Sequence, residues 1–67
     1  MKIEWKDGFT IRVKADNHTV LVSANREGLL SLAAQLTALA EAGGHIHYDE
    51  YNSLEEGSAE MIIEKIR

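Results

Sequence analysis

The chain has 67 residues, contains neither cysteine nor proline, and carries a formal net charge of −4 from seven Lys and Arg against eleven Asp and Glu. This length fits one small domain with a limited core, and the lack of cysteine excludes disulfides and thiolate metal sites. No apolar run approaches the roughly 20 residues that span a membrane, so we expect a single soluble domain over residues 1–67, located in the cytoplasm.

The charge is distributed unevenly along the chain. Residues 1–27 carry five basic and four acidic side chains, whereas residues 28–67 carry two basic and seven acidic ones. The acidic part would repel a phosphate backbone, which disfavours direct nucleic-acid binding. The same charge would attract a basic protein partner.

Alternating residues predict three strands before residue 25. Ile3 and Trp5 alternate with charged neighbours, and Asp7-Gly8 is a strong two-residue hairpin signal. Asp16-Asn17 marks a second turn, after which a β-branched stretch follows. The prediction is a three-stranded meander with strands near residues 2–6, 9–15 and 18–24.

The pattern then changes to that of a helix over residues 26–42. Asn25 is the expected N-cap, Glu27 adds a favourable charge in the first turn, and Gly43-Gly44 is expected to end the helix. One helix face carries an apolar stripe, expected to pack on the sheet, at Leu29, Leu32, Ala33, Leu36, Leu39 and Ala40.

Two further strand candidates, "HIHYDEY" and "SAEMIIEKI", follow the helix and are joined by "NSLEEG". The predicted fold is therefore α+β with the order β-β-β-α-β-β, an antiparallel sheet with one helix packed on one face. The face toward the helix would hold Ile3, Trp5, Phe9, Ile11 and Val13. The opposite face would be charged, with Lys2, Glu4, Lys6, Thr10, Arg12 and Lys14.

His45, His47 and Asp49 stand at alternate positions, so on a strand they would point to the same face. Two histidines and a carboxylate can bind zinc or iron. The favoured interpretation is that Ile46 and Tyr48 face the core and leave the other three on the solvent side. No fourth ligand has a recognisable spacing, so metal binding is the secondary interpretation and no cofactor is expected.

An acidic concentration follows the histidines. It is interpreted either as a solvated surface or as a patch that docks on a basic partner, with Tyr51 as an aromatic anchor. The candidate partner-binding residues are Asp49, Glu50, Tyr51, Glu55, Glu56 and Glu60.

The sequence argues against catalysis. Its serines have no neighbouring histidine motif, and there is no cysteine to serve as a nucleophile. Gly43-Gly44 precedes a predicted strand and not a helix, which excludes a phosphate-binding loop. A one-helix sheet of this size would also form a closed pocket with difficulty.

The pieces "NREGLLSLAAQLTALA" at 25–40 and "HIHYDEYNSLEEGSAEMIIEKI" at 45–66 resemble the immunity protein 32 family of bacterial polymorphic toxin systems. The resemblance implies a small, cytoplasmic, non-catalytic protein that binds and neutralises a cognate toxin. A basic, nuclease-like toxin would fit the acidic surface, which would then block the toxin's active site.

Two other functions remain open on the sequence. One is a metal-binding module that uses His45, His47 and Asp49. The other is a small structural or regulatory domain that forms homo-oligomers through an uncovered sheet face or an edge strand. The sequence leaves the choice between a monomer and a homodimer undecided.

Overall fold

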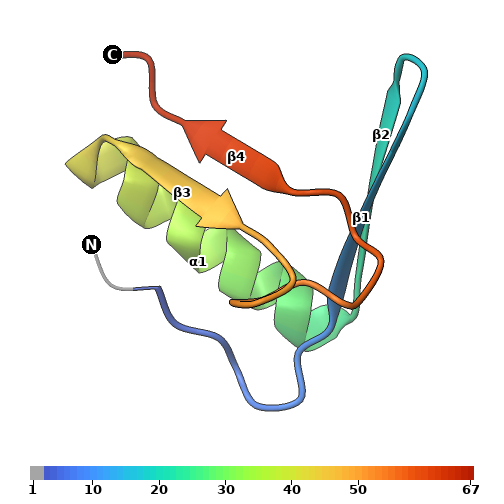
Figure 1. Ribbon diagram of the computed structural model, residues 1–67. Coiled ribbons are helices and arrows are strands. Elements are labelled where there is room, and N and C mark those ends of the chain that lie inside the picture. The colour runs from blue at the N-terminus through green and yellow to red at the C-terminus, as the bar shows by residue number, and fades with distance from the viewer. Residues whose placement is uncertain (1–2) are drawn as a thin grey trace.

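A computed structural model describes residues 3–67 and shows an α+β protein (Figure 1). The elements are β1 (Ile11–Asp16), β2 (Thr19–Ala24), α1 (Arg26–Ala42), β3 (His45–Tyr48) and β4 (Met61–Glu64). No helix in the described part of the chain is long and apolar enough to cross a membrane.

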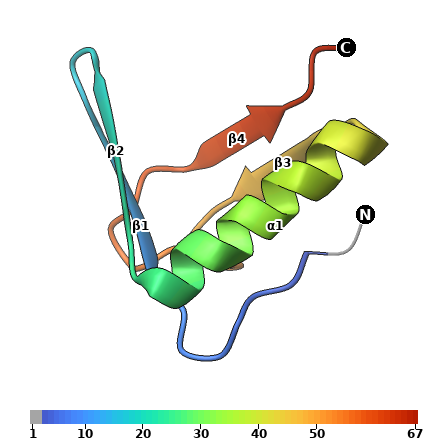
Figure 2. The same cartoon turned by 180° about the vertical axis from the view of Figure 1, so that it is seen from behind.

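The four strands form two separate antiparallel hairpins, β1-β2 and β3-β4. α1 lies behind β3 in Figure 1 and in front of it in Figure 2, and Leu39 of α1 shares a core cluster with Ile46 of β3, so the helix packs on one side of that hairpin. The β1-β2 hairpin projects from the end of the molecule where α1 begins. The predicted α+β class with a single helix is thus confirmed.

The prediction of a single sheet is wrong because another segment occupies the edge of β1. The N–H of Glu55 donates to the carbonyl of Ile11 (2.9 Å), and the N–H of Ala59 donates to the carbonyl of Val13 (2.8 Å). Residues 55–59 therefore lie along β1 where a strand of the second sheet would have to pair. The loop that connects β3 to β4 is therefore hydrogen-bonded to the first sheet, and it lies between that sheet and the second one.

The predicted first strand is also wrong. Residues 3–10 contain no strand, and Lys2, placed on the charged face by the prediction, lies outside the described residues. Side chains of α1 satisfy the backbone here: the N–H of Lys6 donates to Ser31 Oγ, and Gln35 Nε2 donates to the carbonyl of Glu4, both at 2.8 Å. The segment consequently follows the helix and does not pair with a strand.

The predicted turn positions and helix ends are confirmed, but the turn at Asp7-Gly8 does not join two strands, so the predicted hairpin there is wrong. Lys6 and Phe9 close a turn around Asp7-Gly8, and Asn17 adopts a φ of 52° in the turn between β1 and β2. Asn25 is the N-cap of α1, and its side-chain oxygen accepts from the N–H of Gly28 (2.8 Å). Gly43, with a φ of 79°, ends the helix and donates to the carbonyl of Leu39.

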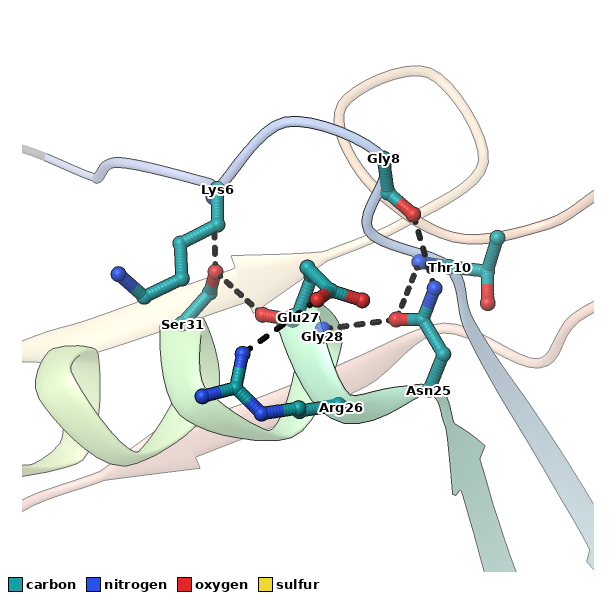
Figure 3. Close-up of polar contacts among 8 residues, drawn as sticks. All are labelled: Lys6, Gly8, Thr10, Asn25, Arg26, Glu27, Gly28 and Ser31. Carbon is teal, nitrogen blue, oxygen red and sulfur yellow. Dashed lines mark hydrogen bonds and ion pairs between the residues drawn. The ribbon is translucent and has the colours of Figure 1, made fainter.

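Asn25 also ties the start of the helix to the N-terminal segment (Figure 3). Its Oδ1 accepts from the N–H of Thr10 (3.0 Å), and its Nδ2 donates to the carbonyl of Gly8 (2.8 Å). Its own N–H donates to the carbonyl of Thr10 (3.2 Å). One side chain therefore caps α1 and sets the path of the chain into β1.

The prediction for the buried helix face is wrong in part. Leu39 is buried and Leu32 is partly buried, but Leu29, Ala33, Leu36 and Ala40 are exposed. The buried positions of α1 are Gly28, Ser31, Gln35 and Leu39. The helix is rotated because its polar Ser31 and Gln35 side chains bind the N-terminal segment.

The core is small. Trp5 stacks on Phe9 with ring centroids 4.4 Å apart and meets the edge of Tyr48 at 6.1 Å, so the N-terminal segment covers one side of the core. The phenol of Tyr48 is buried and donates to Gln35 Oε1 (2.9 Å). Burial raises the pKa of Tyr48. The buried apolar residues are Ile11, Val13, Leu39, Ile46, Tyr48 and Leu54.

Candidate partner-binding surface

The connection between β3 and β4, residues 49–60, contains all six candidate partner-binding residues and is called the acidic loop below. Asp49 organises its first half. The Asp49 carboxylate accepts from the N–H groups of Tyr51 (3.1 Å) and Asn52 (3.0 Å). Its carbonyl accepts from the N–H groups of Ser53 and Leu54. This local pattern is an Asx-type turn, which ends β3 and reverses the chain.

The second half of the acidic loop is held by the body of the protein. Leu54 is buried in the core, and Ser58 Oγ accepts from the N–H of Val13 (3.2 Å). The N–H of Gly57 donates to the Glu50 carboxylate, which closes the loop on itself. These bonds add to the two from Glu55 and Ala59 to β1. The loop is therefore tied down at both ends and across its middle.

The six candidate residues divide into two groups. Asp49 and Glu50 bind backbone N–H groups of the loop, so they shape it. Tyr51 is 96% exposed and makes no side-chain hydrogen bond within residues 3–67. Three further carboxylates are exposed on the same loop: Glu55, Glu56 and Glu60.

The exposed carboxylates of the loop have few oppositely charged side chains near them among the described residues. The Glu60 carboxylate lies 3.5 Å from His47 Nδ1, and both side chains are about half exposed. Neither Glu55 nor Glu56 forms an ion pair within the described residues. An exposed tyrosine beside uncompensated carboxylates can contact a positively charged protein surface, since the aromatic ring supplies contact area and the charges supply attraction.

The two histidines of β3 lie on the solvent side of the sheet, as expected, with Ile46 and Tyr48 buried beneath them. The rings of His45 and His47 are 4.9 Å apart between centroids. Asp49 is partly buried and is engaged in the turn. Within residues 3–67, no group of three or more His, Asp or Glu side chains is placed to hold a metal ion.

A shallow hollow of about 550 Å³ lies on the polar face of the β1-β2 hairpin. Arg12 and Lys14 line it beside Leu21 and Ser23, and Glu55 of the acidic loop borders it. It contains no nucleophile with an adjacent base and is open to solvent, so its residues suit contact with another surface.

Sequence reasoning missed the apolar surface on the outside of the protein. Val20, Leu21 and Val22 of β2 are all exposed, as are Leu29 and Leu36 of α1. The run Val20-Leu21-Val22 could have indicated this surface. In a strand with one solvent-exposed face, apolar and polar residues should alternate, and in this run they do not.

Comparison with protein families matches residues 19–66 to the family described as Immunity protein 32. The match begins at β2, includes α1, β3 and β4, and contains the whole acidic loop. No curated protein and no solved structure shows significant similarity to the chain.

Proposed function

We propose that this chain, which belongs to the immunity protein 32 family, binds and neutralises a cognate bacterial toxin through its acidic loop. The family match supports a toxin as the kind of partner. The single observation that points to the acidic loop is the 96% exposed Tyr51 on a loop whose backbone is otherwise held by hydrogen bonds.

The way the loop is held favours binding without rearrangement. Its backbone is bonded to Ile11 and Val13 of β1, and Leu54 anchors it in the core. A surface that is already ordered loses little conformational entropy when it binds. Tyr51, Glu55 and Glu56 can therefore act as a preorganised contact set.

The chemistry of the loop sets the kind of toxin surface that it fits. A positively charged surface would complement Glu55, Glu56 and Glu60, and an apolar or cationic recess beside it would accommodate Tyr51. A basic active-site cleft, such as that of a nuclease-like toxin, has this character. The chain would act there by covering the cleft in the cytoplasm, without catalysing any reaction.

The experiment uses the protein encoded by the reading frame next to this gene as the candidate toxin. Co-purification of the two proteins and protection of cells that express that product are the expected results. If the neighbouring product is toxic and this chain neither binds it nor restores growth, the proposed function is wrong.

Charge reversal tests the assignment to the acidic loop. Glu56→Lys is expected to slow association by about tenfold or more at low ionic strength, because steered association rates exceed unsteered ones by factors of roughly 10 to 1,000. Glu41→Lys, at an exposed position of α1, makes the same change in net charge outside the loop and should have a much smaller effect. Equal rates for the two variants would contradict the role of the loop.

A further inference from the structure

The outer edge of β2 is open. β2 pairs only with β1, and no backbone hydrogen bond within residues 3–67 reaches its other side. The two edges of the β1-β2 hairpin therefore differ, because residues 55–59 cover the free side of β1.

The groups that this edge presents can be assigned from the bonding of β1. Both the N–H and the carbonyl of Val13 bind residues of the acidic loop, so they point away from β2. Val13 lies opposite Val22, and in an antiparallel pair two opposed residues point their backbone groups in the same sense, inward or outward. Val22 and, by alternation, Val20 thus present free N–H and carbonyl groups at the edge.

The side chains along this edge are uncharged, and the three at its centre, Val20, Leu21 and Val22, are apolar. Val20 is 65% and Leu21 55% exposed, and no Asp, Glu, Lys or Arg occurs between Asp16 and Arg26. Proteins ordinarily protect an edge strand with charge, proline or short length. β4 has such protection, since it has four residues and its ends carry Glu60, Glu64 and Lys65, but β2 has six residues and no such device.

Three exposed large hydrophobic residues, Val20, Leu21 and Val22, follow one another on β2. Ten large hydrophobic residues within the described part of the chain are exposed, against six that are buried. Small domains with a limited core commonly gain stability by association. An apolar run on an unpaired strand edge is a surface suited to strand pairing, and a second copy of the same chain presents the same edge.

We propose that two copies of this chain pair through the outer edges of β2 to form a dimer with one continuous four-stranded sheet. Antiparallel pairing about a two-fold axis makes the edge complementary to itself. With Leu21 opposite Leu21 of the second copy, Val20 and Val22 exchange backbone hydrogen bonds across the axis. This register also keeps Val20 and Val22 on the face that carries Ile11 and Val13.

The dimer goes beyond the proposed function and leaves the acidic loop free. The loop lies on the outer side of β1, whereas the pairing edge belongs to β2. The dimer would therefore carry two acidic loops on opposite margins of the shared sheet. Backbone and apolar contacts make it insensitive to salt, in contrast to toxin association, so the failure of one proposal is distinguishable from that of the other.

Two variants test the edge. In Leu21→Glu, the new carboxylate lies opposite Lys14 within one copy, which favours the hairpin, but the two carboxylates of a dimer would meet across the axis. Val22→Pro removes an N–H group that forms no hydrogen bond with β1, so the hairpin keeps its bonds and only the pairing between two copies loses one. Ile62→Lys on β4 is the matched control, because Ile62 is 53% exposed on a strand that already has charged ends.

Sedimentation of the full chain across a concentration series is the measurement. The weight-average mass should approach twice that of the monomer for the unaltered chain and for Ile62→Lys, and stay at the monomer value for both edge variants. Amide hydrogen exchange of the unaltered chain is a second measurement, and it does not depend on the folding of any variant. The N–H groups of Val20 and Val22 should become at least tenfold more protected at high concentration.

Three results would overturn the proposal. The first is a monomer throughout the concentration series, and the second is dimerisation of folded Leu21→Glu and Val22→Pro at the level of the unaltered chain. The third is a dimer in which the N–H groups of Val20 and Val22 exchange as fast as they do in the monomer, because the contact would then lie elsewhere.

Discussion

Gly28→Ala should destabilise this protein, although the same change stabilises most helices. Gly28 is buried in the first turn of α1, where the Cβ of an alanine would collide with the carbonyl oxygen of Thr10. It would also lie 3.1 Å from the Cβ of Ala24 and 3.2 Å from Oδ1 of Asn25. The obstacles are a backbone carbonyl oxygen, a Cβ atom fixed to the backbone and a hydrogen-bonded side chain, so they cannot easily move aside; Figure 3 shows Thr10 and Asn25 beside Gly28.

The expected change follows from three opposing effects. Replacing glycine with alanine inside a helix contributes about 1 kcal/mol of stability through helix propensity. Overpacking at a closely packed position costs roughly 1–3 kcal/mol. Displacement of Thr10 would also weaken its two hydrogen bonds with Asn25, each worth about 1 kcal/mol. The net result is a destabilisation of about 1–3 kcal/mol.

Thermal unfolding followed by circular dichroism measures this effect. A domain of this length loses about 4–8 °C in Tm for each kcal/mol, so the expected decrease is about 5–20 °C. Thr37→Ala is the control on the same helix, because Thr37 is exposed and its hydroxyl bonds only to the carbonyl of Ala33. That change should leave the Tm equal or slightly higher. A higher Tm for Gly28→Ala would refute the close approach of Thr10 to the helix.

Three further predictions concern the hydrogen bonds that position the N-terminal segment and the core. Asn25→Ala should lower the free energy of unfolding by about 1–2 kcal/mol, since it removes the cap, and Asn25→Asp should also be destabilising because it keeps the acceptor oxygen but sets a carboxylate oxygen against the carbonyl oxygen of Gly8. Tyr48→Phe should cost about 1–3 kcal/mol in chemical denaturation, because Gln35 Oε1 would lose its buried donor. The raised pKa of Tyr48 predicts that stability falls as the pH rises above the ordinary value of 10.0, since the unfolded chain then loses a proton that the folded protein keeps. That decrease should be smaller in Tyr48→Phe, and an identical pH profile in both proteins would contradict the burial of the phenol.

The candidate site is predictable as a stretch of sequence but not as a surface. The charge of Glu55 and Glu56 and the isolated position of Tyr51 are enough to indicate the acidic loop from the order of residues alone. The separate roles of Asp49 and Glu50, which bind backbone N–H groups of the loop, depend on the path of the chain. Composition cannot distinguish a carboxylate that shapes a loop from one that faces solvent.

The local elements of the fold were determined by the sequence alone. The extent of α1, its Asn25 cap, its Gly43 end and the turn at Asn17 all depend on residues within a few positions of each other. Capping and turn formation are short-range effects, so adjacent residues are enough to specify them. Alternation along the strand, also a short-range pattern, identified Ile46 and Tyr48 as the buried residues of β3.

Tertiary structure alone decided which face of α1 is buried and whether residues 3–10 form a strand. These two outcomes are linked, because Ser31 and Gln35 bind the backbone of Lys6 and Glu4 and so turn the helix toward the N-terminal segment. Buried backbone groups must find a partner, and in this protein two side chains far along the chain supply it. The periodicity of apolar residues contains no information on such hydrogen bonds. It therefore predicted Leu29 and Leu36 as core residues, although both are exposed.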